Sequence, residues 1–349
     1  MTRARDVADT QDNLGGAVAP FVGAKNFVIN GSYDIWQRGT TGTITSGSGF
    51  PSADRWFAWT LSAGASVTLS RQNTSDTTNL PFVQYCGRFQ RVAGNTNTGL
   101  LILGQPLETA NSIPLAGKTV TYSFYARAGA NYSSGSSTVS TEIWQTQTTD
   151  ASLSTMLATK SNVAGSAFTL TTTWQRFSIT GTVAAGATQI APVLFYAPTG
   201  TAGANDWFEV TGVQLELGSA ATPFARAGGS IGGELALCQR YYYRTTLSPS
   251  SAAIIGFGTG VSTTAALIGV RLPVTMRTYP SSTVESSGLW IFDGAFSINT
   301  SAGITTGGGL VTDPNMMNIL ATGSGITQYR PYYLYASTTT AFLGITAEL

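Results

Sequence analysis

The chain contains no histidine and only two cysteines among its 349 residues. The absence of histidine excludes Ser-His-Asp and Cys-His catalysis, most zinc sites, and the side chain that usually titrates near neutral pH. The two cysteines, Cys86 and Cys238, are too few for a disulfide framework. Because both stand among apolar neighbours, the sequence favours two buried thiols over one long-range bridge.

Charged residues are also scarce. They make up 10% of the chain, against about a quarter in an average globular protein, and the net charge is +1. Only Lys25, Lys118 and Lys160 are lysines, and no block of five basic residues occurs. The sequence therefore predicts no nucleic-acid partner and no polybasic membrane contact. The glycine-rich stretches lack the Gly-Lys-Ser/Thr ending of a phosphate-binding loop, so no nucleotide cofactor is expected.

Long apolar segments are missing as well. The opening residues, MTRARDVADTQDNLGG, are polar and charged and lack the apolar core of a signal peptide. No apolar run is long enough to span a bilayer, so membrane insertion is not expected. The sequence thus indicates a protein that is made in a cytoplasm and leaves it by another route, such as assembly into a particle that is later released.

Short alternating segments are abundant. Hydrophobic residues make up 42% of the chain and aromatic residues 11%, which is typical of a folded protein despite 40 glycines. From Phe27 onward, about ten segments alternate apolar and polar residues with period two and end at Gly, Pro, Asn or Ser. This pattern predicts an all-β fold, with a jelly-roll β-sandwich over residues 27–226.

The composition changes at residues 219–234, where Pro223 and several glycines predict a linker or a chain crossing at a domain edge. The next stretch, GGELALCQRYY, predicts one short helix of about two turns at a domain junction. Alternating segments then resume, which predicts a second, smaller β-sandwich within residues 227–349. Because no strict repeat occurs, a solenoid or fibrous β-helix is disfavoured.

Several phrases together resemble a known group. The order of these phrases resembles the carbohydrate-binding-module-like jelly roll of bacteriophage tail-fibre and receptor-binding proteins, over about residues 26–280: NGSYDIWQRGTT, ADRW, TYSFYARAG, WQRFSITGTV, VQLELGSAATPFARAGG and LALCQRYYYR. The resemblance implies a virion protein, a homotrimer, that contacts a host-surface glycan or another receptor. Residues 281–349 resemble no pattern of this group.

The first 26 residues are similar to the N-terminal arms that attach such fibres to the virion. Their mixed charges and apolar cluster favour an arm that orders against a partner over a disordered terminus. The residues expected to dock on other virion proteins are Arg3, Arg5, Asp6, Asp9, Leu14, Phe21 and Val22. The interpretation favours a tail location, with a capsid-anchored fibre as the alternative.

A tyrosine block with flanking arginines follows the expected helix. Tyrosine suits an intersubunit contact because its ring packs while its hydroxyl stays hydrated, and arginine stacks on such rings or pairs with carboxylates. The predicted subunit interface is Arg240, Tyr241, Tyr242, Tyr243 and Arg244. Ligand binding by this block is the weaker alternative.

A second aromatic group lies near the C-terminus, in QYRPYYLY. Tyr329, Tyr333 and Tyr335 share one parity and Tyr332 has the other, while Pro331 restricts this strand to an edge or to its beginning. Trp290 and these four tyrosines are the candidate glycan-stacking residues, and Phe292 lies in the same domain. Core packing is the default alternative.

Two tryptophans near the N-terminus could also either bind a glycan or pack in the core. Trp36 and Trp56 stand beside Asp34, Arg38, Asp54 and Arg55. This arrangement fits either a sugar platform or a buried tryptophan pair whose strand ends are held by Asp–Arg pairs. The sequence favours burial, because tryptophan in strands is more often core than site. In VQLELGSAATPF, the alternation predicts a half-buried closing strand that Phe224 caps.

Acidic residues give no catalytic pattern. A glycosidase needs two carboxylates across a groove, and no spacing here indicates such a pair. Calcium held by Asp34, Asp206 or Glu209 is left open, although no Asp-x-Asp-x-Asp loop supports it. The sequence therefore predicts a non-enzymatic virion fibre that binds a receptor. A polysaccharide depolymerase tailspike and a structural spacer are the alternatives.

Overall fold

The computed structural model describes residues 25–245, 253–278, 284–300, 303–306 and 315–349. The predicted docking residues of the N-terminal arm lie outside this part of the chain. None of the helices in the described residues is long and apolar enough to cross a membrane.

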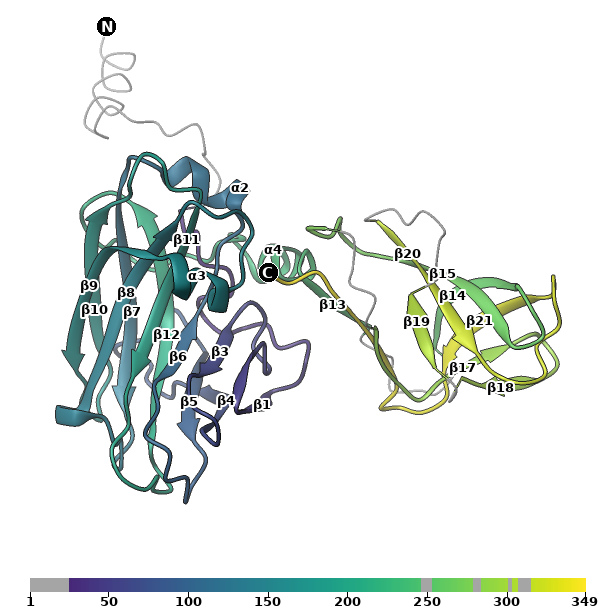
Figure 1. Cartoon of the computed structure of the whole chain (residues 1–349), viewed down its shortest axis with the longest axis horizontal. Helices are drawn as coiled ribbons and strands as arrows, with labels where there is room; N and C mark the ends of the chain where they lie inside the picture. The colour runs from purple at the N-terminus through teal and green to yellow at the C-terminus, as the bar shows by residue number, and fades with distance from the viewer. Residues whose placement is uncertain (1–24, 246–252, 279–283, 301–302, 307–314) are drawn as a thin grey trace, which may run out of the picture.

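The first domain is a sandwich of two antiparallel sheets, each with six strands, which confirms the predicted jelly roll (Figure 1). The first sheet has the order β1 (Thr41–Thr45), β4 (Ser66–Asn73), β5 (Tyr85–Arg91), β12 (Trp207–Leu217), β7 (Thr119–Ala128) and β10 (Gln175–Thr182). The second has the order β2 (Gly47–Gly49), β3 (Phe57–Thr60), β6 (Leu101–Gly104), β11 (Gln189–Tyr196), β8 (Thr138–Thr146) and β9 (Ser161–Thr169).

The core of this domain forms where alternate strand residues meet between the sheets. In β7, Val120, Tyr122 and Phe124 are fully buried, as period-two alternation requires. Tyr33 stacks on Trp56 with ring centroids 4.8 Å apart, and the Trp56 indole donates to the Asn30 carbonyl at 3.0 Å. Burial of Trp56 therefore anchors the residues before β1 onto the sandwich.

Strand β12 differs from its prediction, because it is buried on both faces rather than one. Val213 and Leu215 enter the core, while Gln214 and Glu216 are also buried. The segment after the strand folds back over these polar residues: Gln214 Oε1 accepts a hydrogen bond from the Ala225 amide at 2.8 Å, and Glu216 accepts bonds from Thr222. The segment predicted as a linker is therefore a cover for this strand.

The predicted junction helix is present as α4 (Ile231–Gln239). The Ser230 hydroxyl caps it by accepting a hydrogen bond from the Gly233 amide at 3.1 Å. Cys238 and Tyr241 pack with Ile29 and Ile35 of the first domain, so the helix rests on the jelly roll.

The prediction of a single helix is incomplete. The structure adds α2 (Thr109–Ser112) and α3 (Leu153–Thr159), and short 3-10 turns at η1 (Ile113–Leu115) and η2 (Gly135–Ser137). In α3, Leu153 and Met156 cover Trp144 on the outer side of the second sheet. These helices are too short and too rich in Ser and Thr to give a helical apolar period.

The second domain contains a seven-stranded sheet and a three-stranded sheet. The larger has the order β18 (Ser297–Asn299), β17 (Leu289–Phe292), β21 (Pro331–Ala336), β14 (Ile254–Gly260), β15 (Ala265–Arg271), β20 (Met316–Thr322) and β19 (Ile304–Thr306). The smaller has the order β13 (Tyr242–Arg244), β22 (Phe342–Thr346) and β16 (Val284–Ser287). A separate core that includes Ile268, Ile319 and Leu334 holds this domain together.

Two strands connect the domains. Figure 1 shows β13 running from the first domain to the second and β22 returning, so that the C-terminus lies beside α4. The two strands are antiparallel, with Tyr242 opposite Thr346. Glu348 then pairs with Arg38 and Arg55 of the first domain. The second domain is therefore held at both of its chain ends.

Both cysteines are free and fully buried, which confirms the expectation of two thiols without a bridge. We expect a thiol reagent such as dithionitrobenzoate to label neither Cys86 nor Cys238 in the native protein and both after denaturation, because thiol exchange needs an accessible thiolate. Burial also raises the pKa of both thiols. Rapid labelling of either cysteine in native protein would contradict this burial.

Candidate functional site

Alternation in β17 places aromatic side chains on the outer side of the seven-stranded sheet. Leu289 and Ile291 enter the core of the second domain. Trp290 and Phe292 therefore point to the opposite side of the sheet, where they are partly exposed.

Neighbouring strands continue this arrangement. In β21, Tyr333 and Tyr335 lie between core residues and point outward. Register places Tyr335 opposite Trp290, and Tyr333 opposite both Phe292 and Phe257. We call these five residues the aromatic face. Phe257 is 67% exposed, so the face is open to solvent.

Four of the five rings of the aromatic face contact one another. Tyr333 lies 5.2 Å from Phe292, 6.0 Å from Tyr335 and 6.4 Å from Phe257, measured between ring centroids. Such contacts hold the rings in place without a ligand. The Tyr335 hydroxyl shares a hydrogen bond of 3.0 Å with Ser297 at one side. The result is an uncharged aromatic surface with a hydroxyl rim, which suits the C–H faces and hydroxyls of sugar rings.

Three of the five predicted glycan-stacking residues belong to the aromatic face: Trp290, Tyr333 and Tyr335. Tyr332 does not, because it is 3% exposed and its hydroxyl accepts a hydrogen bond from the Thr327 amide at 2.9 Å. The prediction that Tyr332 stacks on a glycan is therefore wrong, and Tyr332 is a core residue. Tyr329 is 82% exposed, but it lies before β21 at a turn where its φ is 66°. The alternation of side chains along β21 therefore does not extend to Tyr329, and this residue is not part of the aromatic face. Phe257 was missed because only the pairing of β14 with β21 reveals it.

The tyrosine block at the junction packs inside its own chain. Tyr241 and Tyr242 are 1% and 0% exposed, so the prediction that they contact another subunit is wrong. The Arg55 guanidinium lies 3.7 Å from the centre of the Tyr241 ring, and that of Arg38 lies 3.5 Å from the Tyr242 ring. The predicted stacking of arginine on tyrosine occurs, but the partners come from the first domain.

The remaining members of the block also face their own chain. Arg240 pairs with Glu108 at 2.7 Å, and the Tyr241 hydroxyl donates to the same carboxylate at 2.9 Å. Burial raises the pKa of Tyr241 to about 12, so its phenol keeps the proton that it donates. Tyr243 packs on the core of the second domain, and Arg244 lies 3.7 Å from the Phe342 ring centre. The block joins the two domains.

Trp36 and Trp56, near the N-terminus, pack in or against the core rather than form a sugar platform. Trp56, Asp54 and Arg55 are buried, and Trp36 packs on the core. The expected ion pairs exist with other partners, since Asp34 pairs with Arg226 at 2.8 Å and Arg55 pairs with Glu348. A sugar platform at these residues is not formed.

The acids considered for calcium do not converge. Asp206 pairs with Arg91 at 2.9 Å, and Glu209 pairs with Arg88 and Arg127. Within the described ranges, no group of three His, Cys, Asp or Glu side chains has the arrangement of a metal site.

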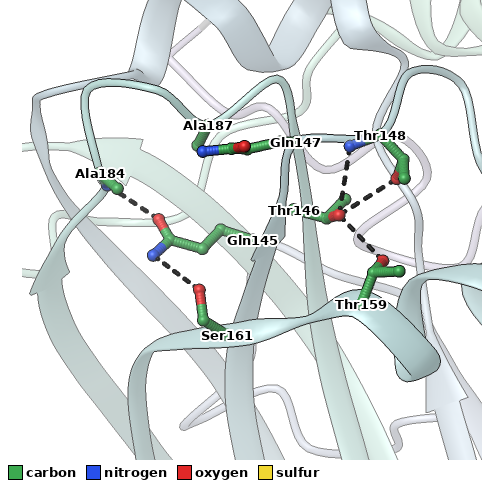
Figure 2. Close-up of a pocket in the computed structure, with 8 residues that line it drawn as sticks. All are labelled: Gln145, Thr146, Gln147, Thr148, Thr159, Ser161, Ala184 and Ala187. Atoms are coloured by element: carbon green, nitrogen blue, oxygen red, sulfur yellow. Dashed lines mark hydrogen bonds between the residues drawn. The ribbon is translucent and has the colours of Figure 1, made fainter.

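A polar pocket of about 430 Å³ lies at one end of the first domain (Figure 2). It is lined by Gln145, Thr146, Gln147, Thr148, Thr159, Ser161, Ala184 and Ala187. Figure 2 shows the Gln145 amide bridging Ala184 and Ser161, and the Thr146 hydroxyl bonded to Thr148 and Thr159. These side chains already use much of their hydrogen-bonding capacity on one another. The lining offers no aromatic ring for stacking, so the aromatic face remains the stronger candidate site.

No protein-family model matches the chain, and no curated protein matches it in sequence. Among solved structures, it is similar to one described as "CBM4 structure and function", with 21% identity and a TM-score of 0.33 over 54% of this chain and 98% of that one. It is similar to the enzymatically active domain of tailspike protein 4 of bacteriophage CBA120, with 14% identity and a TM-score of 0.33 over 55% of this chain and 21% of that one.

A third similar structure is TmCBM61 in complex with β-1,4-galactotriose. The two chains are 12% identical, with a TM-score of 0.31, and the match covers 56% of this chain and 100% of that one. The chain thus spans nearly the full length of the two carbohydrate-binding modules and about a fifth of the tailspike domain. Carbohydrate-binding modules and a phage tailspike are therefore among the structures similar to this chain, at TM-scores that do not assign it a function.

Proposed function

We propose that this protein is a non-enzymatic fibre or receptor-binding protein of a bacteriophage virion, and that its aromatic face binds a host-surface glycan. The observation that carries the proposal is the outward array of Trp290, Phe292, Tyr333, Tyr335 and Phe257 on a sheet whose other side is a complete core. Exposed aromatic residues in such a group indicate a binding surface, because folding alone would bury them.

The absence of catalysis is part of the proposal. Hydrolysis of a glycoside needs two carboxylates across the sugar. The aromatic face carries no acid among its five residues, and the buried acids Asp206, Glu209 and Glu108 are each paired with arginine. Incubation with a bacterial capsule should release no reducing ends; release would favour the alternative of a depolymerase tailspike.

The virion part of the proposal is supported by the sequence resemblance. Residues 1–26 would dock the chain on other virion proteins, in the tail rather than the capsid, after assembly in the host cytoplasm. A homotrimer would present three copies of a weak site on one particle, and such multivalency raises the apparent affinity through effective concentration.

Removal of two rings should abolish most glycan binding. We expect the double variant Trp290→Ala/Tyr333→Ala to lose at least about tenfold in affinity for immobilised bacterial surface polysaccharides, because each stacked ring contributes about 1 kcal/mol or more. Binding of the full chain to a polysaccharide array measures this loss.

Tyr329→Ala is the matched control, since it removes an exposed tyrosine of the same domain outside the aromatic face. It should bind like the original protein. If the double variant keeps full binding, or if the control loses as much, the aromatic face is not the glycan site. If the original protein binds no polysaccharide on the array, the spacer alternative gains support.

A further inference from the structure

A second surface with binding chemistry lies on the first domain, on the outer side of its first sheet. Register aligns Arg88 of β5, Glu209 of β12 and Arg127 of β7 in one row across three strands. The alternating residues Phe89, Phe208 and Ala128 point into the core, so this row faces outward.

Glu209 holds both arginines. Arg88 donates from Nε and Nη2 to Glu209 Oε1 at 2.9 and 2.6 Å, and Arg127 donates from Nε to Oε2 at 2.7 Å. The Glu209 side chain is 0% exposed, whereas each arginine side chain is 25% exposed. Two positive charges therefore share one buried negative charge, and the excess positive charge lies at the surface.

Most N–H groups of the two guanidiniums remain available. Each guanidinium has five donors. Within the described residues, Arg88 Nη1 and both Nη atoms of Arg127 have no hydrogen-bond partner in the structure. Such donors match a planar carboxylate in a bidentate geometry. Because Glu209 already fixes both side chains, an incoming anion would order little that is not ordered already.

Tryptophan rings flank the pair. The Arg88 guanidinium lies 4.2 Å from the centre of the Trp207 ring, and that of Arg127 lies 4.9 Å from the Trp174 ring. A Cβ atom at Gly129 would come within 2.6 Å of the Trp207 ring, so glycine at this position allows the ring to lie against the sheet. Trp207 is partly exposed, although its ring already contacts the Arg88 guanidinium and the Gly129 backbone.

Hydroxyl and amide groups extend this row toward the sheet edge. Ser70 of β4 lies opposite Arg88, and Thr68 lies opposite Gln90, which in turn lies opposite Trp207. All three of these polar side chains are partly exposed. They form a shallow polar strip beside the arginines, and such groups pair with sugar hydroxyls.

A second acid near Arg127 does not neutralise the site. Asp76, on the loop after β4, is close enough for the Arg127 charge to act on it, yet it accepts hydrogen bonds from the amides of Asn79 and Thr78. The bonds from Asn79 hold the pKa of Asp76 below its usual range. Asp76 forms no ion pair with Arg127 within 4.0 Å, so the free donors of Arg127 stay open.

We propose that this surface, made by Arg88, Arg127 and Trp207, binds acidic oligosaccharides of the uronic acid class. The sugar carboxylate accepts from the free guanidinium donors, the saccharide packs against the exposed part of the Trp207 side chain, and Ser70, Thr68 and Gln90 bond the hydroxyls. The aromatic face has no charged residue, so the two surfaces would bind different classes of saccharide. The proposal of this arginine site does not depend on glycan binding by the aromatic face. Nucleic acid fits less well, because the whole chain carries a net charge of only +1.

The test uses the full chain and isothermal titration with hexagalacturonate. We expect measurable binding that weakens as salt is raised, and at least tenfold weaker binding of the fully methyl-esterified hexamer, which has the same rings without the charge. Equal binding of the two hexamers, or no binding of hexagalacturonate, would overturn the proposal. This comparison needs no variant and is therefore independent of folding defects.

Variants then locate the site. Arg127→Gln leaves Glu209 paired with Arg88 and should weaken hexagalacturonate binding at least tenfold. Arg71→Gln removes the same charge from the same sheet, but Arg71 has the parity of the core residue Leu69 and stacks on Tyr85 at 4.5 Å, away from the row. It should leave the affinity within twofold. Equal losses in both variants would mean that only bulk charge matters, which contradicts a site. The Trp290→Ala/Tyr333→Ala variant should bind hexagalacturonate normally.

Discussion

Replacement of Glu348 by glutamine should lower the free energy of unfolding by about 3 kcal/mol. Glu348 is the partner of both Arg38 and Arg55, and the Arg55 side chain is 1% exposed. A glutamine amide keeps the shape of the side chain but cannot neutralise a buried guanidinium. The cost is large because a buried charge is left without its counter-charge, rather than because one contact is lost.

The same change should loosen the connection between the domains. Glu348 lies two residues after the end of β22, the strand that returns from the second domain, and its carbonyl accepts a hydrogen bond from Arg277 at 2.9 Å. Urea unfolding monitored by tryptophan fluorescence gives the stability, and limited proteolysis of the variant should cut near β13 and β22 sooner than in the original protein.

Asp150→Asn provides the matched control. The Asp150–Arg277 pair also joins the two domains, but its atoms are 3.4 Å apart and the Asp150 side chain is 41% exposed. Asparagine keeps the acceptor for the Thr109 amide and tolerates the φ of 47° at this position. This variant should lose less than about 1 kcal/mol. Similar losses in the two variants would show that burial of Arg55 does not set the energetics of the junction.

Alternation in the sequence was sufficient to predict an all-β fold. The period of two in Val120, Tyr122 and Phe124 depends only on local residues, and so do the capped helix at 231–239 and the burial of Trp56. Both β-domains and the junction helix follow from such local patterns. The cover over β12 did not follow, because its polar residues Gln214 and Glu216 find partners only after the chain turns back.

The binding surfaces depend on contacts between distant segments, which one sequence does not reveal. The parity that separates Tyr332 from Tyr333 was visible, but which parity faces the core is decided by pairing with β14 and β17. Tyr241 and Tyr242 were assigned to another subunit because their partners, Arg55 and Arg38, lie about 200 residues earlier in the chain. Arg88 and Arg127 came together only through Glu209 on a third strand.

The junction should also become more stable in mild acid, through Asp54. This carboxyl is 0% exposed and accepts a hydrogen bond from the Gln37 amide at 3.0 Å. The Gln37 side chain in turn donates to the Tyr242 carbonyl at 2.6 Å, at the start of β13. Burial raises the pKa of Asp54 from 3.8 to about 6, although the positive charge of Arg38 opposes this shift.

The direction of this pKa shift determines how the stability of the protein changes with pH. Because the folded protein binds the Asp54 proton more tightly than the unfolded chain, protonation favours folding. The gain is fully present below about pH 4, the unfolded value, and is lost as the pH rises through about 6. The rise of the Asp54 pKa from 3.8 to about 6 on folding corresponds to about 3 kcal/mol in total, of which about 2 kcal/mol develops between pH 7 and pH 4.5.

Asp54→Asn isolates this contribution, since the other titrating groups are common to both proteins. The unfolding free energy of the original protein minus that of the variant should rise by about 2 kcal/mol when urea unfolding is repeated at pH 4.5 instead of pH 7. A difference that stays constant over this range would mean that Asp54 titrates near its ordinary value in the folded protein. In that case water would reach the carboxyl between Gln37 and the start of β13, and the junction would be less tightly packed than the structure shows.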